Sequence, residues 1–515
     1  VVLDVVVYSQ QILDRVPVLR AVQAADRGTP GVRVGRVQHE HAALDPVHDL
    51  FTLAGLRLVF VGGRHMVDAQ ILPNPQPKFA IPQVTGAFLG VVQRHAPFGT
   101  SAAVAVVAES LEDRLDFRCK FCRLWFTGLL ILRRGRRAQR AAQHDEENSY
   151  PFENMAALRE SGYTSMPIPA DMGGGGASLL EVCIAQNRLA QGDGATALAV
   201  NMHFGLPYIM CDLIKAGDDH PRPLLEKIAA EKLMVFGAVT DPQVDSLKGI
   251  TGLGYTTVKA TKTDGGFLIN GRKGFATNSP GGDLFGSTAI YNDPDEGDVG
   301  LIFVIPPDTE GLTCLNDWNT MGMRASQSHS WELKDVFVSD EGVIKHKPWV
   351  WDEYARGLWA WHGGSFASIY LGIAKAARDF AIEATKGRSR IPFKHPESYY
   401  PGHQFLAAEM DITLNAAWTF QKDIAVRLDG EHGRDDDTLM AAVGMQYFCM
   451  KAAQDVVNKA VDMVGGAALA KGRPLERYYR DVRAGTMHPL GGFDALEVIG
   501  KHAFGLPFDV EPRFV

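Results

Sequence analysis

Residues 236–246 read FGAVTDPQVDS and residues 254–279 read GYTTVKATKTDGGFLINGRKGFATNS, and this stretch decides the fold. Apolar and polar residues alternate along most of it, which is the two-residue period of a β-strand. Asp264-Gly265 and Asn270-Gly271 interrupt the alternation, and such pairs are typical of tight hairpin turns. We therefore expect consecutive hairpins of an antiparallel sheet.

A threonine stands beside a tight turn at each end of this stretch, Thr240 and Thr277. Hydroxyl and backbone N–H groups at strand ends suit a flat heteroaromatic ring, because the edge of such a ring alternates hydrogen-bond donors and acceptors. The alternative is an ordinary β-domain with threonines on its surface. The stretch alone favours neither interpretation.

Composition limits the classes of function. A chain of 515 residues, 46% of them hydrophobic and 22% charged, has room for roughly two to four domains with their own cores. The formal net charge of −8 offers no basic excess for phosphates, so nucleic acid is not an expected partner. The apolar runs are too short for membrane insertion and the six cysteines are scattered, which favours a soluble, cytoplasmic protein. Cys119 and Cys122 form a lone C-x-x-C, a weak signal for redox or zinc chemistry, and no metal site is expected.

Changes in composition and hydrophobic periodicity divide the chain into four segments. Residues 1–140 have far more arginine than lysine and no sustained periodicity; they stay unassigned, and one hypothesis is that they are a misassigned upstream translation. Residues 141–233 have helical spacing, residues 234–345 continue the β pattern, and residues 346–515 carry long apolar stripes at three- and four-residue spacing. We therefore predict an α+β multi-domain fold: an N-terminal helical domain, an antiparallel β-barrel-like middle domain and a C-terminal four-helix bundle.

Three local features each allow two interpretations. The basic cluster at residues 133–137 is either a patch for an acidic surface or, as we favour, a solvated loop. Residues 173–176 are four glycines before a helix, where they can cradle a phosphate; the spacing and lysine of a P-loop are missing, so we favour a structural turn. Arg324, in a glycine- and serine-containing turn, either binds an anion or holds its loop in place.

Several motifs resemble the acyl-CoA dehydrogenase superfamily over roughly residues 141–510. The matching motifs are VTDP (239–242), GRKGFATN (271–278), GMRAS (322–326), Gly465-Gly466, Pro474 and Arg480-Asp481. The first two are similar to that family's VTEP and NGxKxWITN strands, and the last three follow one another at family spacing. The resemblance implies the fold predicted above, with FAD as its cofactor.

The resemblance also implies which residues hold the cofactor. Those expected beside the isoalloxazine ring are Val239, Thr240, Phe275 and Thr277. A second set would reach the FAD of a neighbouring subunit: Arg388 or Arg390, Phe393 and Gln404, with Gly465 and Gly466 near the adenosine-diphosphate end. Such sharing implies a homodimer or homotetramer. Ser246 and Arg324 are the candidates for contact with the substrate.

The activity expected of the family is α,β-dehydrogenation of an acyl-CoA thioester, as in fatty acid metabolism. A base takes the α-proton while the β-hydride moves to flavin N5, and hydrogen bonds to the thioester carbonyl stabilise the developing enolate. The electrons then pass to a partner such as an electron-transfer flavoprotein. The base is usually a glutamate, either in a turn after the Arg-Asp pair or on the helix before the bundle.

This chain departs from the family at the base. The turn position falls on Pro489, with His488 just before it, and the helix position falls near His362. A histidine in this turn resembles the flavin-dependent monooxygenases of the same fold, which take reduced FMN or FAD from a separate flavin reductase. An imidazole can hydrogen-bond an oxygen intermediate or deprotonate a phenol near neutral pH. The alternatives are a structural turn histidine for His488 and packing for His362.

Three functions therefore stay open. Dehydrogenation of an acyl-CoA comes first, as the commonest activity of the family, and a reductase-fed monooxygenase with His488 in its active site comes second. The third is a catalytically silent subunit that binds flavin or acyl groups as a partner of an enzyme.

Overall fold

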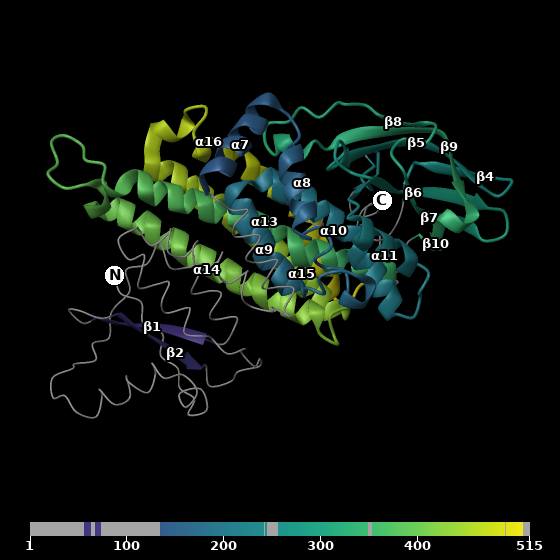
Figure 1. Ribbon diagram of the computed structural model, residues 1–515, viewed down its shortest axis with the longest axis horizontal. Coiled ribbons are helices and arrows are strands. Elements are labelled where there is room, and N and C mark those ends of the chain that lie inside the picture. Colours follow the sequence, from purple (N-terminus) through teal and green to yellow (C-terminus); the bar gives the residue numbers. More distant parts are fainter. Residues whose placement is uncertain are drawn as a thin grey trace. The chain divides into compact units, whose positions relative to one another are not determined.

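A computed structural model describes the strands β1 (Leu56–Gly62) and β2 (Val67–Pro73), and residues 134–507 except 242, 245–255, 349–352 and 490 (Figure 1). Three residues singled out from the sequence, Cys119, Cys122 and Ser246, lie outside these described residues. Their predicted roles stay predictions.

The chain divides into two compact units, Val1–Phe117 and Arg118–Val515. In the first unit β1 pairs antiparallel with β2, from Leu56 opposite Pro73 to Gly62 opposite Val67. The second unit contains all the helices that the structure describes and a further sheet.

The second unit begins with helices, as expected. The described ones are α7 (Arg134–Glu147), α8 (Phe152–Glu160), α9 (Leu179–Gly192), α10 (Gly194–Lys215) and α11 (Arg222–Glu231). The basic cluster at residues 133–137 largely lies in the first turn of α7, so the loop interpretation is wrong. Arginine is a good helix former, and the alanines that follow it continue the helix.

The glycine run before α9 is a structural turn. The N–H groups of Gly174, Gly175 and Gly176 donate to backbone carbonyl oxygens at 2.8–3.1 Å, so none of them is available to a phosphate. Ser178 then caps α9 in a capping box with Glu181.

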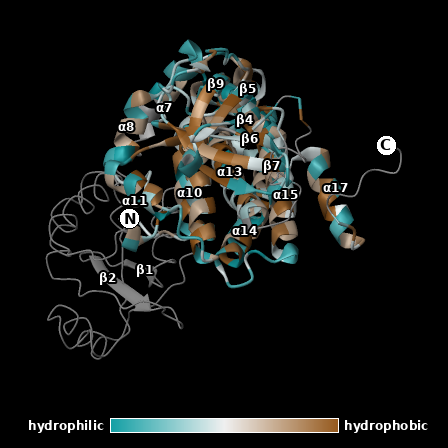
Figure 2. Cartoon of the chain, turned by 90° about the vertical axis from the view of Figure 1, so that its right-hand side faces the viewer, coloured by the Kyte–Doolittle hydropathy of each residue, from teal (hydrophilic) through white to brown (hydrophobic). Residues whose placement is uncertain are grey.

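One described helix, α10, is long and apolar enough to cross a membrane by length and composition alone. Two thirds of its apolar window is buried inside the protein. Apolar residues on all sides are therefore explained by packing against neighbouring helices. Figure 2 shows α10 and α13 as apolar helices within the body of the unit.

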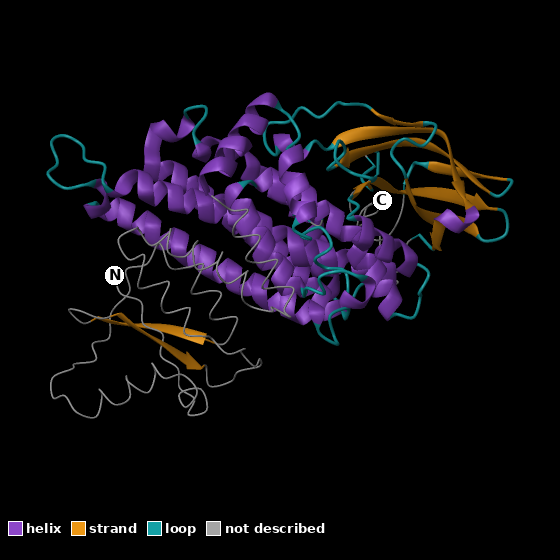
Figure 3. Ribbon diagram, in the orientation of Figure 1, coloured by secondary structure: helices purple, strands orange, loops and turns teal. Residues whose placement is uncertain are grey.

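An eight-stranded sheet follows the first helices and lies to one side of them (Figure 3). Its strands are β3 (Val235–Ala238), β4 (Lys259–Thr263), β5 (Gly266–Ala276), β6 (Leu284–Asp293), β7 (Gly297–Ile305), β8 (Leu312–Cys314), β9 (His329–Ser339) and β10 (Val343–His346). Their order is β10-β7-β6-β4-β5-β9-β8, with β3 paired to β6. The sheet is mixed, because β3 and β4 each run parallel to β6 while the other pairs are antiparallel. These two pairings join strands that no tight turn connects, so hairpin signals could not predict them.

The hairpin expected at Asp264-Gly265 is confirmed, since Thr263 pairs with Gly266 across the turn from β4 to β5. The second expected hairpin is wrong. Asn270-Gly271 lies inside β5, where the pairing with β9 shifts register. The Asn270 amide exchanges hydrogen bonds with Asp335 on β9, so the local Asn-Gly signal marks a bulge within one strand.

A helical bundle completes the unit and confirms the predicted fold class. Its described helices are α13 (Glu353–Lys386), α14 (Pro401–Asp429), α15 (Asp436–Val464), α16 (Pro474–Val482) and α17 (Gly492–Ala503). α13 is its central helix and packs against α9, α10, α14 and α15. The apolar residues predicted from helical spacing, such as Phe366, Ile369 and Ile373, are fully buried there.

The N-terminal helices, the sheet and the bundle meet at Arg480-Asp481 on α16. The Arg480 guanidinium binds both carboxylate oxygens of Asp145 on α7 at 2.5 and 2.9 Å, and donates to the carbonyl oxygen of Met321 at 2.7 Å. The Asp481 carboxylate accepts from the N–H of Met323 at 2.6 Å. Met321 and Met323 belong to the loop between β8 and β9, so one residue pair holds all three parts together.

This junction predicts a dependence of stability on pH. Burial raises the pKa of Asp481 to about 7, so the folded protein binds a proton there that the unfolded chain releases near pH 4. The contribution of this proton to stability is present below about pH 4 and is lost as the pH rises through about 7. Asp481→Asn keeps the acceptor for Met323 but cannot ionise. Relative to the wild type, the free energy of unfolding of this variant should therefore increase by a few kcal/mol as the pH rises from about 5 to about 8.

Urea unfolding at the two pH values measures this gain. Asp423→Asn, at an exposed carboxylate on α14, is the control and should change the two stabilities equally. An Asp481→Asn variant with the same stability difference from wild type at both pH values would contradict a buried, titrating Asp481.

Candidate active site

The four residues expected beside a flavin ring converge at one end of the sheet. Gly237 on β3 forms an antiparallel bridge with Thr277, and the N–H of Gly274 donates to the carbonyl oxygen of Thr240 at 3.0 Å. Val239 and Thr240 therefore lie beside Phe275 and Thr277. Residues more than thirty positions apart in the sequence form one surface.

Phe275 is unusual in both backbone and exposure. It lies within a register shift between Lys273 and Ala276, its φ is +55°, and 57% of its surface is exposed. A left-handed φ is strained for a bulky residue, and such strain clusters at functional sites. The ring of Trp318 stands edge-on to it with centroids 6.0 Å apart. The exposed ring of Phe275 and the half-buried ring of Trp318 thus lie together beside polar strand ends.

Thr277 belongs to a chain of buried hydroxyls that the sequence did not reveal. Its hydroxyl lies 2.8 Å from that of Ser328, which lies 2.8 Å from that of Ser326. Both serines come from the loop before β9, about fifty residues further along the chain. The sequence signal was their position at and just after the end of the GMRAS motif, but only the folded loop places them beside Thr277.

Lys273 is a second residue that the sequence did not single out. Its side chain is fully buried, and the ammonium donates to the carbonyl oxygen of Val239 at 3.2 Å and to the hydroxyl of Thr256 at 2.6 Å. Burial lowers the pKa of Lys273 to about 7, although the nearby Asp241 carboxylate favours its charged form. From the buried side of the sheet end, Lys273 thus holds in place the backbone of Val239, next to Thr240.

The hydrogen bonds of Arg324 hold the loop between β8 and β9 in place. Its guanidinium donates to the carbonyl oxygens of Asp145 at 2.6 Å and Thr320 at 3.0 Å, and to the side-chain oxygen of Asn319 at 3.3 Å. These contacts agree with the second interpretation of this residue, a loop clamp. Contact with substrate stays a prediction.

The two candidate histidines lie together around one face of α13. His362, Phe366 and Tyr370 follow one another at four-residue spacing, which places their side chains on the same side of the helix. The His362 ring stacks on Phe366 with centroids 5.1 Å apart, and the His488 ring packs against Phe366 at 4.5 Å. The Tyr370 hydroxyl hydrogen-bonds to Nε2 of His488. We call His362, Phe366, Tyr370 and His488 the histidine cluster.

The histidine cluster is apolar and electrically neutral. Burial lowers the pKa of His488 to about 4. Burial, with a smaller contribution from His488, lowers the pKa of His362 to about 3. No carboxylate among the described residues hydrogen-bonds to either ring, and Pro489, at the position predicted for the family's glutamate, only accepts a hydrogen bond from Gln446 through its carbonyl oxygen. Neither ring is therefore charged or strongly basic near neutral pH.

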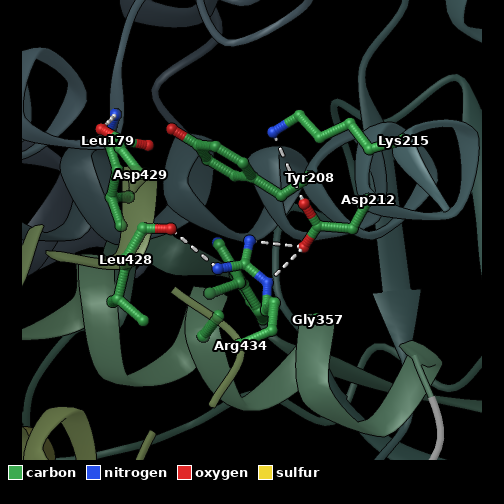
Figure 4. A pocket seen from close by; sticks show the side chains of 10 residues that line it. Leu179, Tyr208, Asp212, Lys215, Gly357, Leu428, Asp429 and Arg434 are labelled. Carbon is green, nitrogen blue, oxygen red and sulfur yellow. Dashed lines mark hydrogen bonds and ion pairs between the residues drawn. The ribbon is translucent and has the colours of Figure 1, made fainter. Parts of the chain in front are cut away.

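A small cavity of about 30 Å³ lies near the histidine cluster, because Trp361 lines it and also packs against His362 with centroids 4.4 Å apart. Figure 4 shows Tyr208 with its hydroxyl directed to the side where Asp429 lies, and the Arg434–Asp212 ion pair across the cavity. The Tyr208 hydroxyl and the indole nitrogen of Trp361 have no hydrogen-bond partner among the described residues. This volume has room for little more than a water molecule or one polar group.

The second predicted cofactor set gathers at another place. Arg388 and Arg390 both bind the buried carboxylate of Glu397, and Arg388 also donates to the carbonyl oxygen of Val464 at 3.1 Å. Gly465 and Gly466 follow Val464 and face open space. The side chain of Phe393 is exposed, and the Gln404 amide donates to the carbonyl oxygen of Ser398.

Figure 1 shows the loop between α13 and α14, which carries both arginines, at the end of the bundle away from the sheet. α13 alone spans about 50 Å, because each of its 34 residues adds about 1.5 Å. The structure therefore brings each of the two predicted cofactor sets together but does not join them within one chain. Among the described residues no group of acidic, cysteine or histidine side chains forms a metal site.

Helices, a mixed sheet and a helical bundle in this order define an acyl-CoA dehydrogenase-like protein. The chain belongs to the acyl-CoA dehydrogenase family. Its residues 134–231 match "Acyl-CoA dehydrogenase, N-terminal domain", residues 238–336 match the middle domain and residues 365–491 match the C-terminal domain.

Named relatives differ in their stated activities. Putative acyl-CoA dehydrogenase YdbM of Bacillus subtilis is 33% identical over 353 residues, which cover 68% of this chain and 89% of YdbM. L-evernosamine nitrososynthase of a Micromonospora species is 30% identical over 384 residues, covering 72% and 87%. The solved structure of KijD3 with FMN and a dTDP-amino-keto sugar is 26% identical, has a TM-score of 0.63, and covers 74% of this chain and 94% of KijD3.

The support that Lys273 provides is testable by substitution. Lys273→Met removes the donor to Val239 and Thr256 from a buried position, and should lower the free energy of unfolding by about 2–4 kcal/mol. Thermal and urea unfolding measure the loss. Lys262→Met is the matched control: Lys262 forms a half-exposed ion pair with Asp340, worth about 1 kcal/mol or less. Equal losses from the two substitutions would contradict a supporting role for Lys273.

Proposed function

We propose that the protein is a flavin-dependent monooxygenase that acts on a small molecule and receives its reduced flavin from a separate reductase. The observation that carries this proposal is the histidine cluster. Both positions where the family keeps its glutamate base are histidine or proline here, and the two imidazoles are neutral and meet around Phe366. Acyl-CoA dehydrogenation needs a base that this arrangement supplies poorly.

A flavin fits the surface at the end of the sheet. The exposed ring of Phe275, with Trp318 edge-on beside it, offers an aromatic contact for the ring system, and Val239, Thr240 and Thr277 offer backbone and hydroxyl groups for its polar edge. The structure of KijD3 in complex with FMN supports a flavin in this fold. FMN and FAD are both compatible with these residues.

The bound reduced flavin would supply two electrons to molecular oxygen, of which one atom enters the substrate and the other leaves as water. The residues of the chain provide the environment for that reaction. The apolar rings of the histidine cluster keep water from the reacting groups, and His488 hydrogen-bonds an oxygen or substrate group in the active site. Lys273 and the hydroxyls of Ser326 and Ser328 hold the strand ends that contact the flavin.

The names of the relatives suggest a class of substrate. A nitrososynthase forms a nitroso group by its name, and making one from an amine requires transfer of oxygen to nitrogen. We therefore place amines, including amino sugars, first among candidate substrates. A neutral, apolar site suits such a nucleophile, because an amine can react with an electrophilic oxygen only in its unprotonated form.

Acyl-CoA dehydrogenation is the second candidate, because YdbM, at 33% identity, is named a putative acyl-CoA dehydrogenase. It would require an α-proton to move to His488 or His362. Imidazoles whose pKa is lowered to about 4 and about 3 by burial are weak bases for that step.

We further propose that the protein acts as a homo-oligomer. The second cofactor set, with Arg388, Arg390 and the open backbone at Gly465-Gly466, lies away from Thr277 in the same chain. A neighbouring subunit would bring this set to the flavin held at the sheet. Sedimentation analysis with and without flavin tests this arrangement.

One experiment separates the two candidate reactions. The protein is supplied with reduced FMN or FAD and oxygen together with a panel of amines, and products are analysed by mass spectrometry. A hydroxylamine, one oxygen atom heavier than its amine, or a nitroso compound, which has in addition lost two hydrogens in a second oxidation, supports the monooxygenase. Anaerobic bleaching of oxidised FAD by an acyl-CoA, with no oxygenated product from the panel, would instead establish the dehydrogenase.

Thr277→Ala should weaken flavin binding about 3- to 10-fold, the usual effect of one lost hydrogen bond, and should shift the flavin absorption spectrum. Flavin titration followed by fluorescence measures both. Thr313→Ala, at an exposed threonine on β8, is the control and should bind flavin like the wild type. Unchanged affinity and spectrum in Thr277→Ala would place the flavin elsewhere.

His488→Ala should lower turnover by roughly 10²- to 10⁴-fold, as expected for loss of a residue that assists proton transfer or stabilises charge at the reacting centre. Flavin affinity should change much less. His502→Gln, on the outer helix α17, provides a control of the same residue type. Wild-type kinetics in the His488 variant would make that histidine a structural residue.

A further inference from the structure

The position of the proton on His488 follows from its contact with Tyr370. Among the described residues, the Tyr370 hydroxyl hydrogen-bonds only to Nε2 of His488. Tyr370 is fully buried, and burial raises the pKa of its hydroxyl well above its ordinary value, with Asp481 adding to the effect. Its proton therefore stays on the oxygen and needs an acceptor, because a buried hydroxyl without one is costly.

Two arrangements of this hydrogen bond are conceivable, and the structure favours one. If Nε2–H donated to the tyrosine oxygen, the Tyr370 O–H proton would have no acceptor among the described residues. If Tyr370 donates to Nε2, the buried phenol proton has its acceptor, and the group without a described partner is instead the Nδ1–H of His488, a residue that is only half-buried. A neutral imidazole that accepts at Nε2 carries its own proton on Nδ1.

We propose that Tyr370 is a positioning residue that holds His488 as the Nδ1–H tautomer, so that the ring offers a hydrogen-bond donor and no free lone pair to the active site. Packing fixes the rest of the His488 ring, since Phe366 lies against it and His362 stacks on Phe366. Nδ1 of His488 hydrogen-bonds to no described residue, which leaves its N–H for a bound molecule.

This inference rests on the proposed function for its consequence, and sharpens it. A histidine with Nε2 already occupied cannot take an α-proton through Nδ1, so His488 would not replace the glutamate of a dehydrogenase. As a fixed N–H donor it can stabilise negative charge on an oxygen or hold an oxygen-bearing group of the substrate. Tyr370 would thus decide which chemistry the histidine can perform.

The tautomer is measured directly by magic-angle-spinning NMR of protein labelled with ¹⁵N in the histidine rings. The difference between wild type and His488→Gln assigns the signals of His488. At neutral pH we expect Nδ1 to show the shift of a protonated ring nitrogen and Nε2 that of an unprotonated acceptor. A wild-type spectrum with the proton on Nε2 would overturn the proposal, even if Tyr370 variants fail to fold.

Tyr370→Phe then tests the cause. Loss of the phenol should release His488 from the single Nδ1–H tautomer, whereas Tyr163→Phe, which removes another buried hydroxyl, bonded to Gln186, should not. An unchanged His488 tautomer in Tyr370→Phe would show that packing alone sets it.

In turnover, Tyr370→Phe should raise the fraction of oxygen released as hydrogen peroxide relative to oxygenated product. Protein that oxygenates no substrate would refute the proposed function while leaving the NMR result intact. Thus the two ideas can fail separately.

Discussion

The ion pair of Arg480 with Asp145, together with the bond from Met323 to Asp481, is the constraint on which the rest of the structure depends. Each charge is partly buried and satisfied on several sides, and Glu476 also binds the Arg480 guanidinium. A buried charge that lost one partner would be strongly destabilising, so the parts it joins are held in one arrangement. Those parts are the first described helix of the unit, the loop that leaves the sheet, and the segment that leads to His488.

This junction explains why a site forms where it does. The loop before β9 carries Trp318, Ser326 and Ser328 to the strand ends at Phe275 and Thr277. The same loop is tied to α16, and the chain continues from α16 through the turn Arg483–Met487 to His488. The aromatic surface of the sheet and the histidine cluster of the bundle are therefore positioned by one set of contacts. A shift of the loop would alter both.

The lowered pKa values of His362 and His488 distinguish this site from one that contains a base of ordinary strength. A carboxylate needs hydrogen bonds or charge to remain ionised in an apolar site, and here the position predicted for the family's glutamate is Pro489. Burying an imidazole costs far less free energy than burying a carboxylate, because the imidazole is neutral when desolvated. It can still act as a directed hydrogen-bond donor or acceptor. In place of a carboxylate that accepts protons, the site contains imidazole rings, and their hydrogen-bond partners decide what role the rings can have. Oxygen transfer to a neutral nucleophile is compatible with that exchange.

The order of domains, the strand character of residues 254–279 and the apolar faces of the bundle helices were determined by the sequence itself, because periodicity and turn chemistry are local properties. The motif residues Val239, Thr240, Phe275 and Thr277 could also be named in advance. Only the tertiary structure decided that Asn270-Gly271 is a bulge and that β3 and β4 run parallel to β6, since both depend on strands distant in the sequence. It likewise decided that Lys273 supports the strand end and that Tyr370 meets His488. A hydrogen bond between residues 118 positions apart, like that of Tyr370 with His488, leaves no periodic signal, and burial sets its chemistry only after the chain has folded.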